Sequence, residues 1–497
     1  MTDLAISHPA RTRLKLSLPL LFGLFVYAVT LVRPSPLLGD PDTYWHVVIG
    51  NWILVHHAVP HQDLWSYTKR GAPFVPLEWL GEVIIAGLYD KLGWAGLAAS
   101  AALAVAAAIA LQLRVLLKNL APAHALIAAA LAWNLFLAHL LARPFIYAEP
   151  ILVLWMGGLL AARSEDRAPS FYLLPLMVLW ANLHASYLLG LGFAGLFAGE
   201  AVIAAPDKKA RLREVRRWGL FCALAFAAAL ATPYGISGVL QPLKLLHMHY
   251  ALSVISEWQS PNFEQYQPLE LWILLVFGTA LARGWRLPVT RLLMVLFLLH
   301  MALSHARNVE LLGLLAPLLA APALGAQLAG AGSRLLSFPR FDRALTALAE
   351  PASAAGRALA ACLVLVISVA LLLPHPIDRD KDKVTPAAAL AAVEAHGVTG
   401  PVFNGYGFGG YLIFRGIKTF IDGRADFYGD RFLKRYIDAV DLRKDSLPRI
   451  LAEYGITWTL LPPNAPAVVF LKHLPGWRQL YADKTAVVDV REDALKR

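Results

Sequence analysis

The sequence predicts an α-helical polytopic membrane protein with about 11 transmembrane helices and a small α/β C-terminal domain outside the cytoplasm. Three observations predict this fold class. Of the 497 residues, 58% are hydrophobic and 16% are charged, and the mean hydropathy is +0.55. Long apolar runs recur as far as residue 374, and none follows in residues 375–497. A soluble globular protein does not need so much apolar surface, so the bilayer must solvate most of the chain.

The apolar runs define the transmembrane domain, residues 1–374. Each is long enough to cross about 30 Å of hydrocarbon when tilt is allowed. No small-residue cleavage site follows the first run, which is therefore predicted to be an uncleaved signal anchor. The predicted spans lie near residues 17–33, 95–117, 121–141, 146–162, 171–187, 188–204, 218–233, 268–282, 289–305, 309–329 and 358–374.

The distribution of basic residues predicts the orientation. Threading the spans alternately from a cytoplasmic N-terminus places most Lys and Arg inside, among them Arg11, Arg13, Lys15, the run 208–217 and Arg334. Before residue 375, the outer side keeps only Arg33, Lys69, Arg70, Lys91, Arg143, Lys244 and Arg307. The positive-inside rule therefore places the first loop, 34–94, and the domain 375–497 in the periplasm or outside the cell, with the chain in a bacterial inner membrane.

Composition and motifs exclude several classes of function. The net charge of +11 comes from scattered loop residues rather than one basic face, so no nucleic-acid partner is expected. Cys222 and Cys362 lie in apolar runs and provide neither a disulfide framework nor a cysteine metal site. The sequence has no P-loop, zinc signature or nucleophile elbow, so no nucleotide cofactor is expected.

The C-terminal domain alternates helical and β-rich segments. Thr385 and Pro386 precede an Ala-rich run that ends at Gly397, which is typical of a capped helix. Further helices are predicted near 429–440 and 447–454. Strands are predicted at 401–403, 418–422 and 456–461, and a hairpin is predicted from 477–481 and 485–491.

Two segments of this domain are rich in glycine or charge. Residues 404–411 are glycine-rich but lack the spacing of a phosphate-binding loop. The segment Asp422-Gly423-Arg424 is interpreted as a turn with an internal Asp–Arg pair, in preference to a ligand site.

Two carboxylates lie just beyond the first span, in the segment Gly39-Asp40-Pro41-Asp42. Such a pair can act as a general base, bind a metal or position an acceptor hydroxyl. The alternative is a plain turn, because Asp, Pro and Gly favour turns for conformational reasons alone. Trp45 and His46 follow closely and add stacking and polar groups to the candidate site.

Other candidate residues lie in outer loops or at the outer ends of spans. Glu78 begins a short apolar segment, 78–92, predicted to be an amphipathic helix at the membrane interface. Arg143 runs against the charge trend, which indicates a phosphate or carboxylate partner; snorkelling to the headgroups is the alternative. Glu149 lies one or two turns into the next helix.

The remaining candidates share the same side of the membrane. Asn182 and His184 lie near the outer end of an apolar helix, where polar side chains mark either interhelical hydrogen bonds or a cavity wall. Arg307 is the best candidate of its cluster for holding an anion. Glu257, in the loop 234–267, adds a carboxylate, and a solvated loop residue is its alternative interpretation.

This pattern resembles the GT-C superfamily of membrane glycosyltransferases. The resemblance rests on the acidic motif 39–46, the aromatic and acidic stretch 76–82 that leads to a turn at 89–93, the multi-span body and the outer C-terminal domain. It is similar in style to the branch of the protein mannosyltransferases and aminoarabinose transferases. The tail is similar to that of bacterial multi-span proteins placed near this superfamily.

The resemblance implies transfer of a sugar from a polyprenyl-phosphate donor to an acceptor hydroxyl of a glycan, lipid or protein. Asp40 or Asp42 matches the first-loop acid, the general base of the family; Pro41 separates the two acids, so the catalytic one stays open. Arg143 and Arg307 would hold the leaving phosphate. Some family members use a divalent cation and others do not, so metal dependence is also open. Two other classes remain as alternatives, a lipid or glycan transporter or flippase and a non-catalytic envelope-assembly protein.

Overall fold

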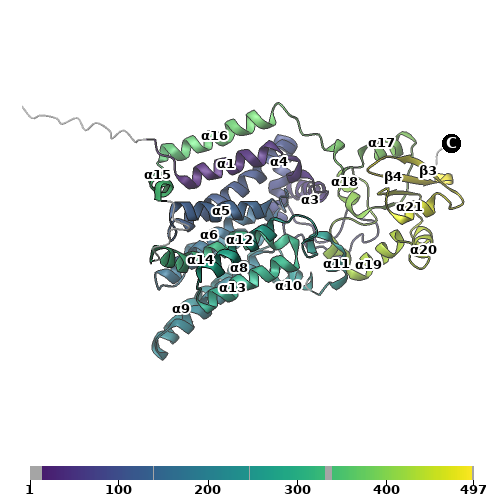
Figure 1. Ribbon diagram of the computed structural model, residues 1–497. Helices are drawn as coiled ribbons and strands as arrows, with labels where there is room; N and C mark the ends of the chain where they lie inside the picture. The colour runs from purple at the N-terminus through teal and green to yellow at the C-terminus, as the bar shows by residue number, and fades with distance from the viewer. Residues whose placement is uncertain (1–13, 138, 246, 331–338, 495–497) are drawn as a thin grey trace, which may run out of the picture.

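A computed structural model describes residues 14–137, 139–245, 247–330 and 339–494. A helical bundle occupies one part of the molecule and the C-terminal α/β domain the other (Figure 1). The predicted inner residues Arg11, Arg13 and Arg334 lie outside the described ranges.

Each predicted span coincides with a helix. Among the described residues, five helical segments are long and apolar enough to cross a membrane: α4, α6, α8, the segment Ala306–Leu328 and α16. The chain is therefore an integral membrane protein, and the count of about 11 spans stays a prediction. The helices at the predicted spans are α1 (Leu18–Val32), α4 (Trp79–Leu116), α5 (Pro122–Phe136), α6 (Phe145–Ser164), α7 (Leu174–Leu183), α8 (Tyr187–Ala204), α9 (Lys208–Ala229), α12 (Pro268–Arg283), α13 (Val289–Ser304), α14 (Val309–Gly330) and α16 (Ala354–Leu372).

The predicted short helix at 78–92 forms the first part of α4. Gly93 has a non-helical backbone (φ 60°, ψ −157°), so the segment before it is set at a kink to the bundle helix that follows. The first part packs on α3 (Asp42–His56), where Trp79 and Val83 contact a cluster that includes Trp45 and Ile49. Its position at the membrane interface stays a prediction.

The loops predicted to lie outside gather between the bundle and the C-terminal domain. These elements are α2 (Ser35–Leu38), α3, α10 (Ile236–Leu245), α11 (His249–Val254), η2 (Ser256–Trp258) and η3 (Ala306–Asn308). Helix α15 (Pro339–Ala349) and the projecting end of α9 lie at the opposite end of the bundle (Figure 1). This arrangement agrees with the alternating threading of the chain.

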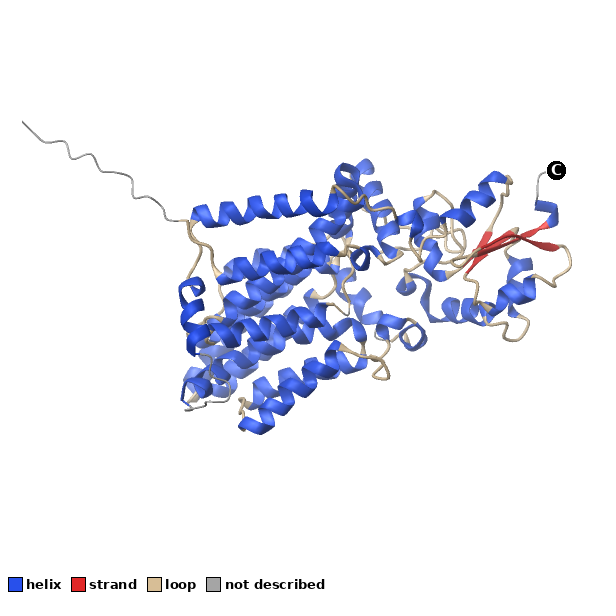
Figure 2. Cartoon of the chain, turned by 45° about the horizontal axis from the view of Figure 1, so that its top comes forward, coloured by secondary structure: helices blue, strands red, loops and turns tan. Residues whose placement is uncertain are grey.

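The C-terminal domain is built on one four-stranded sheet in the order β1-β2-β4-β3 (Figure 2). β1 (Val402–Asn404) and β2 (Trp458–Leu461) are parallel, and β4 (Val487–Arg491) runs antiparallel to both β2 and β3 (Trp477–Ala482), which confirms the hairpin. The predicted helices are also present. The helices of the domain are η5 (Arg379–Lys381), α17 (Ala387–Ala395), η6 (Tyr406–Phe408), α18 (Gly409–Phe414), α19 (Ala425–Val440), α20 (Ser446–Glu453), α21 (Pro466–Leu471) and η7 (Glu492–Ala494).

The predicted strand at 418–422 is wrong. The side chain of Asn404 binds the backbone there, accepting from Phe420 N at 2.8 Å and donating to Ile421 O at 2.7 Å. Thr419 instead joins the first loop, since its amide donates to Trp65 O at 3.2 Å. An amide side chain and a distant loop thus replace a neighbouring strand, which residue propensity does not reveal.

The first loop and the C-terminal domain pack tightly on each other. Tyr44 of α3 stacks edge to face on Tyr411 of α18, with ring centres 5.2 Å apart, and its hydroxyl bonds to that of Thr385 at 2.8 Å. Arg379 lies over the same ring at 4.0 Å. At Gly410 a side chain would collide with the carbonyl of Pro41, so this close approach requires glycine. These contacts fix the acidic motif against the C-terminal domain.

Candidate functional site

The two first-loop acids have different environments. Asp40 is buried, and its Oδ1 accepts from the amide of Asp42 at 3.0 Å, as in an Asx turn. Asp42 is the first residue of α3, where the helix dipole favours a carboxylate. The turn interpretation is thus correct for Asp40, whose carboxylate accepts the hydrogen bond of the turn. The carboxylate of Asp42 takes no part in this hydrogen bond.

Arg143 joins three carboxylates. Its Nη2 donates to Asp40 Oδ1 at 2.8 Å, its Nε contacts the other oxygen of Asp40, and Nη2 lies 3.0 Å from Asp42 Oδ2. Its Nη1 donates to Glu257 Oε2 at 3.2 Å. The predicted partner of Arg143 is therefore a set of carboxylates, and the side chain does not snorkel away from the protein.

Asp42 lines a cavity of about 780 Å³, whereas Asp40 does not. The Asp40 carboxylate is engaged by Arg143, and its backbone carbonyl accepts from Arg379 Nη2 at 2.8 Å. Burial, with the nearby charge of Glu257, raises the pKa of the Asp42 carboxyl to about 7. Asp42 is thus the acid of the pair that is open to a ligand.

The cavity brings together nine of the ten predicted site residues. They come from the first loop, from the ends of several helices and from the loop 234–267. The nine are Asp42, Trp45, His46, Glu78, Arg143, Glu149, His184, Glu257 and Arg307.

Two carboxylates and two histidines of the cavity lining contact one another in pairs. Glu78 Oε1 lies 3.2 Å from His184 Nε2, and His46 Nδ1 lies 3.4 Å from Glu82 Oε1. Burial, with the charge of His184, lowers the pKa of His46 to about 3, so its ring is neutral at pH 7. Asn182 instead forms interhelical hydrogen bonds, the other role predicted for polar residues of this helix. It accepts from Trp79 Nε1 at 2.7 Å and donates to Ala231 O at 2.9 Å.

Arg307 and Glu257 also line the cavity. Arg307 stacks on the ring of Trp258 at 4.2 Å, and its Nη1 lies 3.6 Å from Glu257 Oε1. Burial opposes ionisation of Glu257, but Arg143 and His139 hold its pKa below the ordinary range. Glu257 is therefore an ion-paired carboxylate, and its interpretation as a solvated loop residue is wrong.

The C-terminal domain adds lining residues that the sequence did not reveal. Tyr406, Gly423, Arg424 and Asp426 all face the cavity. The Tyr406 hydroxyl donates to Gly423 O at 2.9 Å, and the carboxylate of Asp42 lies directly against Gly423. The glycine between Asp422 and Arg424 indicates that another group packs closely on the backbone there. The sequence alone does not identify that group as the carboxylate of Asp42.

Two further lining residues, His139 and Glu310, come from the bundle side. His139 bridges two acids, with Nε2 at 3.3 Å from Glu257 Oε2 and Nδ1 at 3.3 Å from Glu310 Oε1. His139 gave no signal in the sequence because it is a single polar residue at the end of an apolar run.

The predicted Asp422–Arg424 pair is present and has a third member. Arg424 Nη2 donates to Asp422 Oδ2 and Arg424 Nη1 to Asp63 Oδ1, both at 2.7 Å, and all three side chains are buried. The guanidinium also lies 4.9 Å from the ring centre of Phe74. This triad ties the first loop to the turn that carries Gly423.

The carboxylates and histidines around the cavity are the side chains that could bind a metal. Among the described residues, no group of three or more His, Cys, Asp or Glu side chains is arranged to hold a metal ion. The carboxylates of Asp40, Asp42 and Glu257 converge on the guanidinium of Arg143 instead.

Comparison with known proteins shows similarity in structure rather than in sequence. No family model matches the chain, and no curated protein sequence matches it significantly. The apo structure of ArnT from Cupriavidus metallidurans matches with a TM-score of 0.51 and 15% identity, over 97% of this chain and 98% of that one. A structure of the same enzyme bound to undecaprenyl phosphate has a TM-score of 0.47 and 16% identity, over 95% and 97%.

A second protein gives the same result. The archaeal oligosaccharyltransferase AglB from Archaeoglobus fulgidus, in complex with an inhibitory peptide and a dolichol-phosphate, matches with a TM-score of 0.51 and 13% identity, over 89% of this chain and 69% of that one. ArnT and AglB are both GT-C glycosyltransferases. The resemblance read from the sequence is thus confirmed at the level of architecture, and the chain has the fold of the GT-C superfamily of membrane glycosyltransferases.

Proposed function

We propose that the protein transfers a sugar from a polyprenyl-phosphate donor to an acceptor hydroxyl on the extracytoplasmic side of the membrane. The observation that carries this proposal is the two-part lining of the cavity around Asp42. One part is charged, with Asp42, Arg143, Glu257 and Arg307; the other is an apolar wall contributed by α8 and α13. The apolar wall consists of Leu188, Leu189, Phe193 and Leu196 of α8 and Phe297 and Met301 of α13.

A lipid-linked sugar phosphate has the same two-part character. Its polyprenyl chain fits an apolar wall of bundle helices, and its phosphate fits the arginines of the charged part. The dolichol-phosphate bound to AglB, a protein of similar fold, supports a donor of this class. The outer location rests on the charge distribution of the loops and on the position of the cavity beside the C-terminal domain.

Arg307 is the cation that would hold the leaving phosphate. Arg143 is shared among three carboxylates, so its charge is largely committed within the protein. Arg307 has a single carboxylate contact, at 3.6 Å, and its planar group is held against Trp258. A pre-oriented guanidinium stabilises the charge that develops on the phosphate as the sugar leaves. Arg143 then serves as the positioning residue for Asp42.

Asp42 would act as the general base. It accepts the proton of the acceptor hydroxyl while the hydroxyl oxygen bonds to the anomeric carbon and the bond from that carbon to the phosphate oxygen breaks. The products are the glycosylated acceptor and the polyprenyl phosphate. A base with a pKa of about 7 is well matched to proton transfer near neutral pH.

The test is release of lipid phosphate by the purified full-length protein from a panel of polyprenyl-phosphate sugars. Asp42→Asn should lower turnover by about 10²- to 10⁴-fold, the usual contribution of a general base. Asp90→Asn is the matched control, because Asp90 is an exposed acid of the same loop. Full transfer activity in Asp42→Asn would refute the assignment, whatever the activity of Asp40→Asn. No release from any donor would favour a transporter or an envelope-assembly protein.

A further inference from the structure

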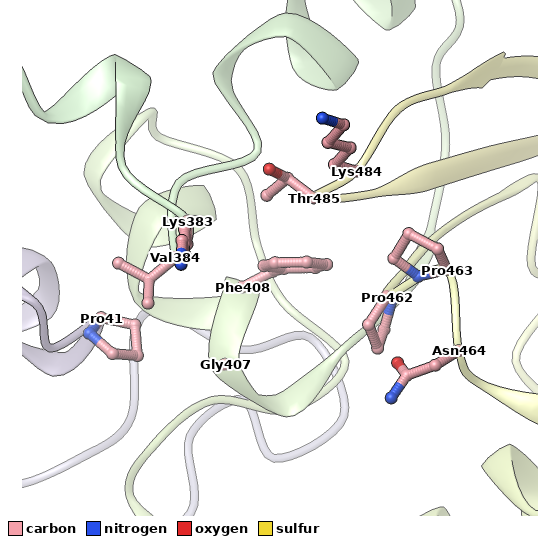
Figure 3. A pocket seen from close by; sticks show the side chains of 10 residues that line it. All are labelled: Pro41, Lys383, Val384, Gly407, Phe408, Pro462, Pro463, Asn464, Lys484 and Thr485. Carbon is pink, nitrogen blue, oxygen red and sulfur yellow. The ribbon is translucent and has the colours of Figure 1, made fainter.

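A second cavity, of about 420 Å³, lies between the first loop and the C-terminal domain (Figure 3). Pro41 is its only lining residue from the first loop. The others come from the segment before α17, from η6, from the turn after β2 and from the β3–β4 turn: Lys383, Val384, Gly407, Phe408, Pro462, Pro463, Asn464, Lys484 and Thr485. None of the functions assigned above uses this cavity.

Its charged groups are two exposed lysines, Lys383 and Lys484, and its other polar side chains, Asn464 and Thr485, are neutral. Among the residues that the structure describes, neither Lys383 nor Lys484 has a carboxylate partner, and no lining residue is acidic. The acids adjacent in sequence are engaged elsewhere. Asp382 pairs with Arg379 at 3.3 Å, and Asp483 accepts from the amide of Thr485 at 2.7 Å. Neither lysine of the cavity is therefore held in an ion pair with a carboxylate among the described residues.

Its apolar groups are flat and rigid. Figure 3 shows the ring of Phe408 between Val384 on one side and Pro462 and Pro463 on the other, with the hydroxyl of Thr485 nearby. The C–H face of a sugar ring packs well on an aromatic or proline surface, while donors at the rim bind its oxygens. Such a lining suits an oxygen-rich ring compound better than a lipid chain.

The two cavities adjoin at two backbone segments. In the first loop, Pro41 lines the second cavity and Asp42 lines the first. In η6, Gly407 lines the second cavity and Tyr406 the first. A side chain at Gly407 would lie 4.0 Å from the ring of Pro41, so these two segments touch. Residues adjacent in the chain to Asp42 and to Tyr406 therefore line the second cavity.

We propose that the second cavity binds an anionic glycan, one that carries a phosphate or a carboxylate group, through Lys383 and Lys484. Its identity as the acceptor rests on the function proposed above, whereas binding itself does not. The acceptor would approach Asp42 from the water-filled side, while the lipid-linked donor occupies the bundle side. The unpaired lysines select for the anion, and Phe408 with the two prolines supports the ring.

Binding is tested without turnover, with the full-length protein and defined probes. The probes are oligogalacturonate for the carboxylate, a phosphorylated mannose oligosaccharide for the phosphate and maltotetraose as the uncharged reference. The variant is K383A/K484A, and the control is K418A/K444A, which removes two exposed lysines of the same domain and the same net charge. Calorimetry in nanodiscs gives the affinities at low and high salt.

At least one anionic probe should bind more tightly than maltotetraose, by about tenfold or more, and lose this advantage in K383A/K484A and at high salt but not in the control. The probe that binds identifies the anion. Equal affinity for charged and neutral probes, equal losses in the two double variants, or no binding of any probe would overturn the proposal. If binding fails while polyprenyl phosphate is still released from the donor, this inference alone falls; if binding holds and no donor reacts, the proposed transfer falls.

Discussion

The carboxylate of Asp42 lies against the backbone of Gly423, although one belongs to the first loop and the other to the C-terminal domain. A Cβ atom at Gly423 would collide with Asp42 Oδ1. The C-terminal domain therefore forms part of the space around the proposed base, and the path of a single backbone segment sets the position of that carboxylate.

Replacing Gly423 with alanine should lower transfer by about tenfold or more, because the added methyl group displaces the reacting carboxylate and small misplacements are costly in catalysis. Turnover of polyprenyl-phosphate sugar by the purified variant measures the effect. The control is Gly87→Ala, since a side chain at Gly87 meets no atom within 4 Å. Equal activity of the two variants would contradict a role for this contact.

The pH dependence of transfer should report Asp42. A general base must be ionised, so activity should rise with pH around a midpoint near 7, the raised pKa of this carboxyl. The charge of Glu257 contributes to that raised pKa. Glu257→Gln removes this charge, stabilises the ionised form of Asp42 and should move the midpoint to lower pH.

The control for this shift is Glu264→Gln, which removes an exposed acid from the same loop. Rate profiles from pH 5 to 9, measured at saturating donor, provide the readout. A Glu257→Gln midpoint that stays in place or moves to higher pH would exclude Asp42 as the group that titrates.

Arg307→Ala should weaken the interaction with the donor phosphate. Loss of a charge-assisted contact of this kind costs about 1.5–3 kcal/mol, which corresponds to a tenfold to hundredfold loss. Product inhibition by polyprenyl phosphate measures the contact directly, because the lipid phosphate carries the group that Arg307 would hold. Arg33→Ala is the control, since Arg33 is an exposed arginine on the same predicted side. Unchanged inhibition in Arg307→Ala would assign the phosphate to another residue.

The features predicted correctly from the sequence are those set by local composition. Apolar length is visible in a single window, so helices stand at all eleven predicted spans. Polar residues at the ends of membrane spans avoid the lipid and face the protein interior or a cavity. Nine of the ten candidates accordingly line one cavity.

The features missed depend on contacts between distant segments. Nothing near residues 418–422 shows that the side chain of Asn404 satisfies their backbone, so the predicted strand is absent. The choice between Asp40 and Asp42 required the position of Arg143, which follows three further helices, α3, α4 and α5. Pairing of Asp63 with Arg424 was likewise invisible, because each looks like an ordinary loop charge until the two domains are docked.

That pairing leads to a prediction about stability. Arg424 is the only cation within hydrogen-bond distance of the buried Asp63 and Asp422 among the described residues. Arg424→Ala leaves both carboxylates buried without a cationic partner, a loss that typically costs about 3–5 kcal/mol. The C-terminal domain should therefore unfold or separate from the first loop at a lower temperature, as followed by tryptophan fluorescence. Arg435→Ala is the matched control, because its partner Glu453 is exposed and such surface pairs are worth about 0–1 kcal/mol. Equal losses of stability in the two variants would mean that the triad does not hold the first loop to the C-terminal domain.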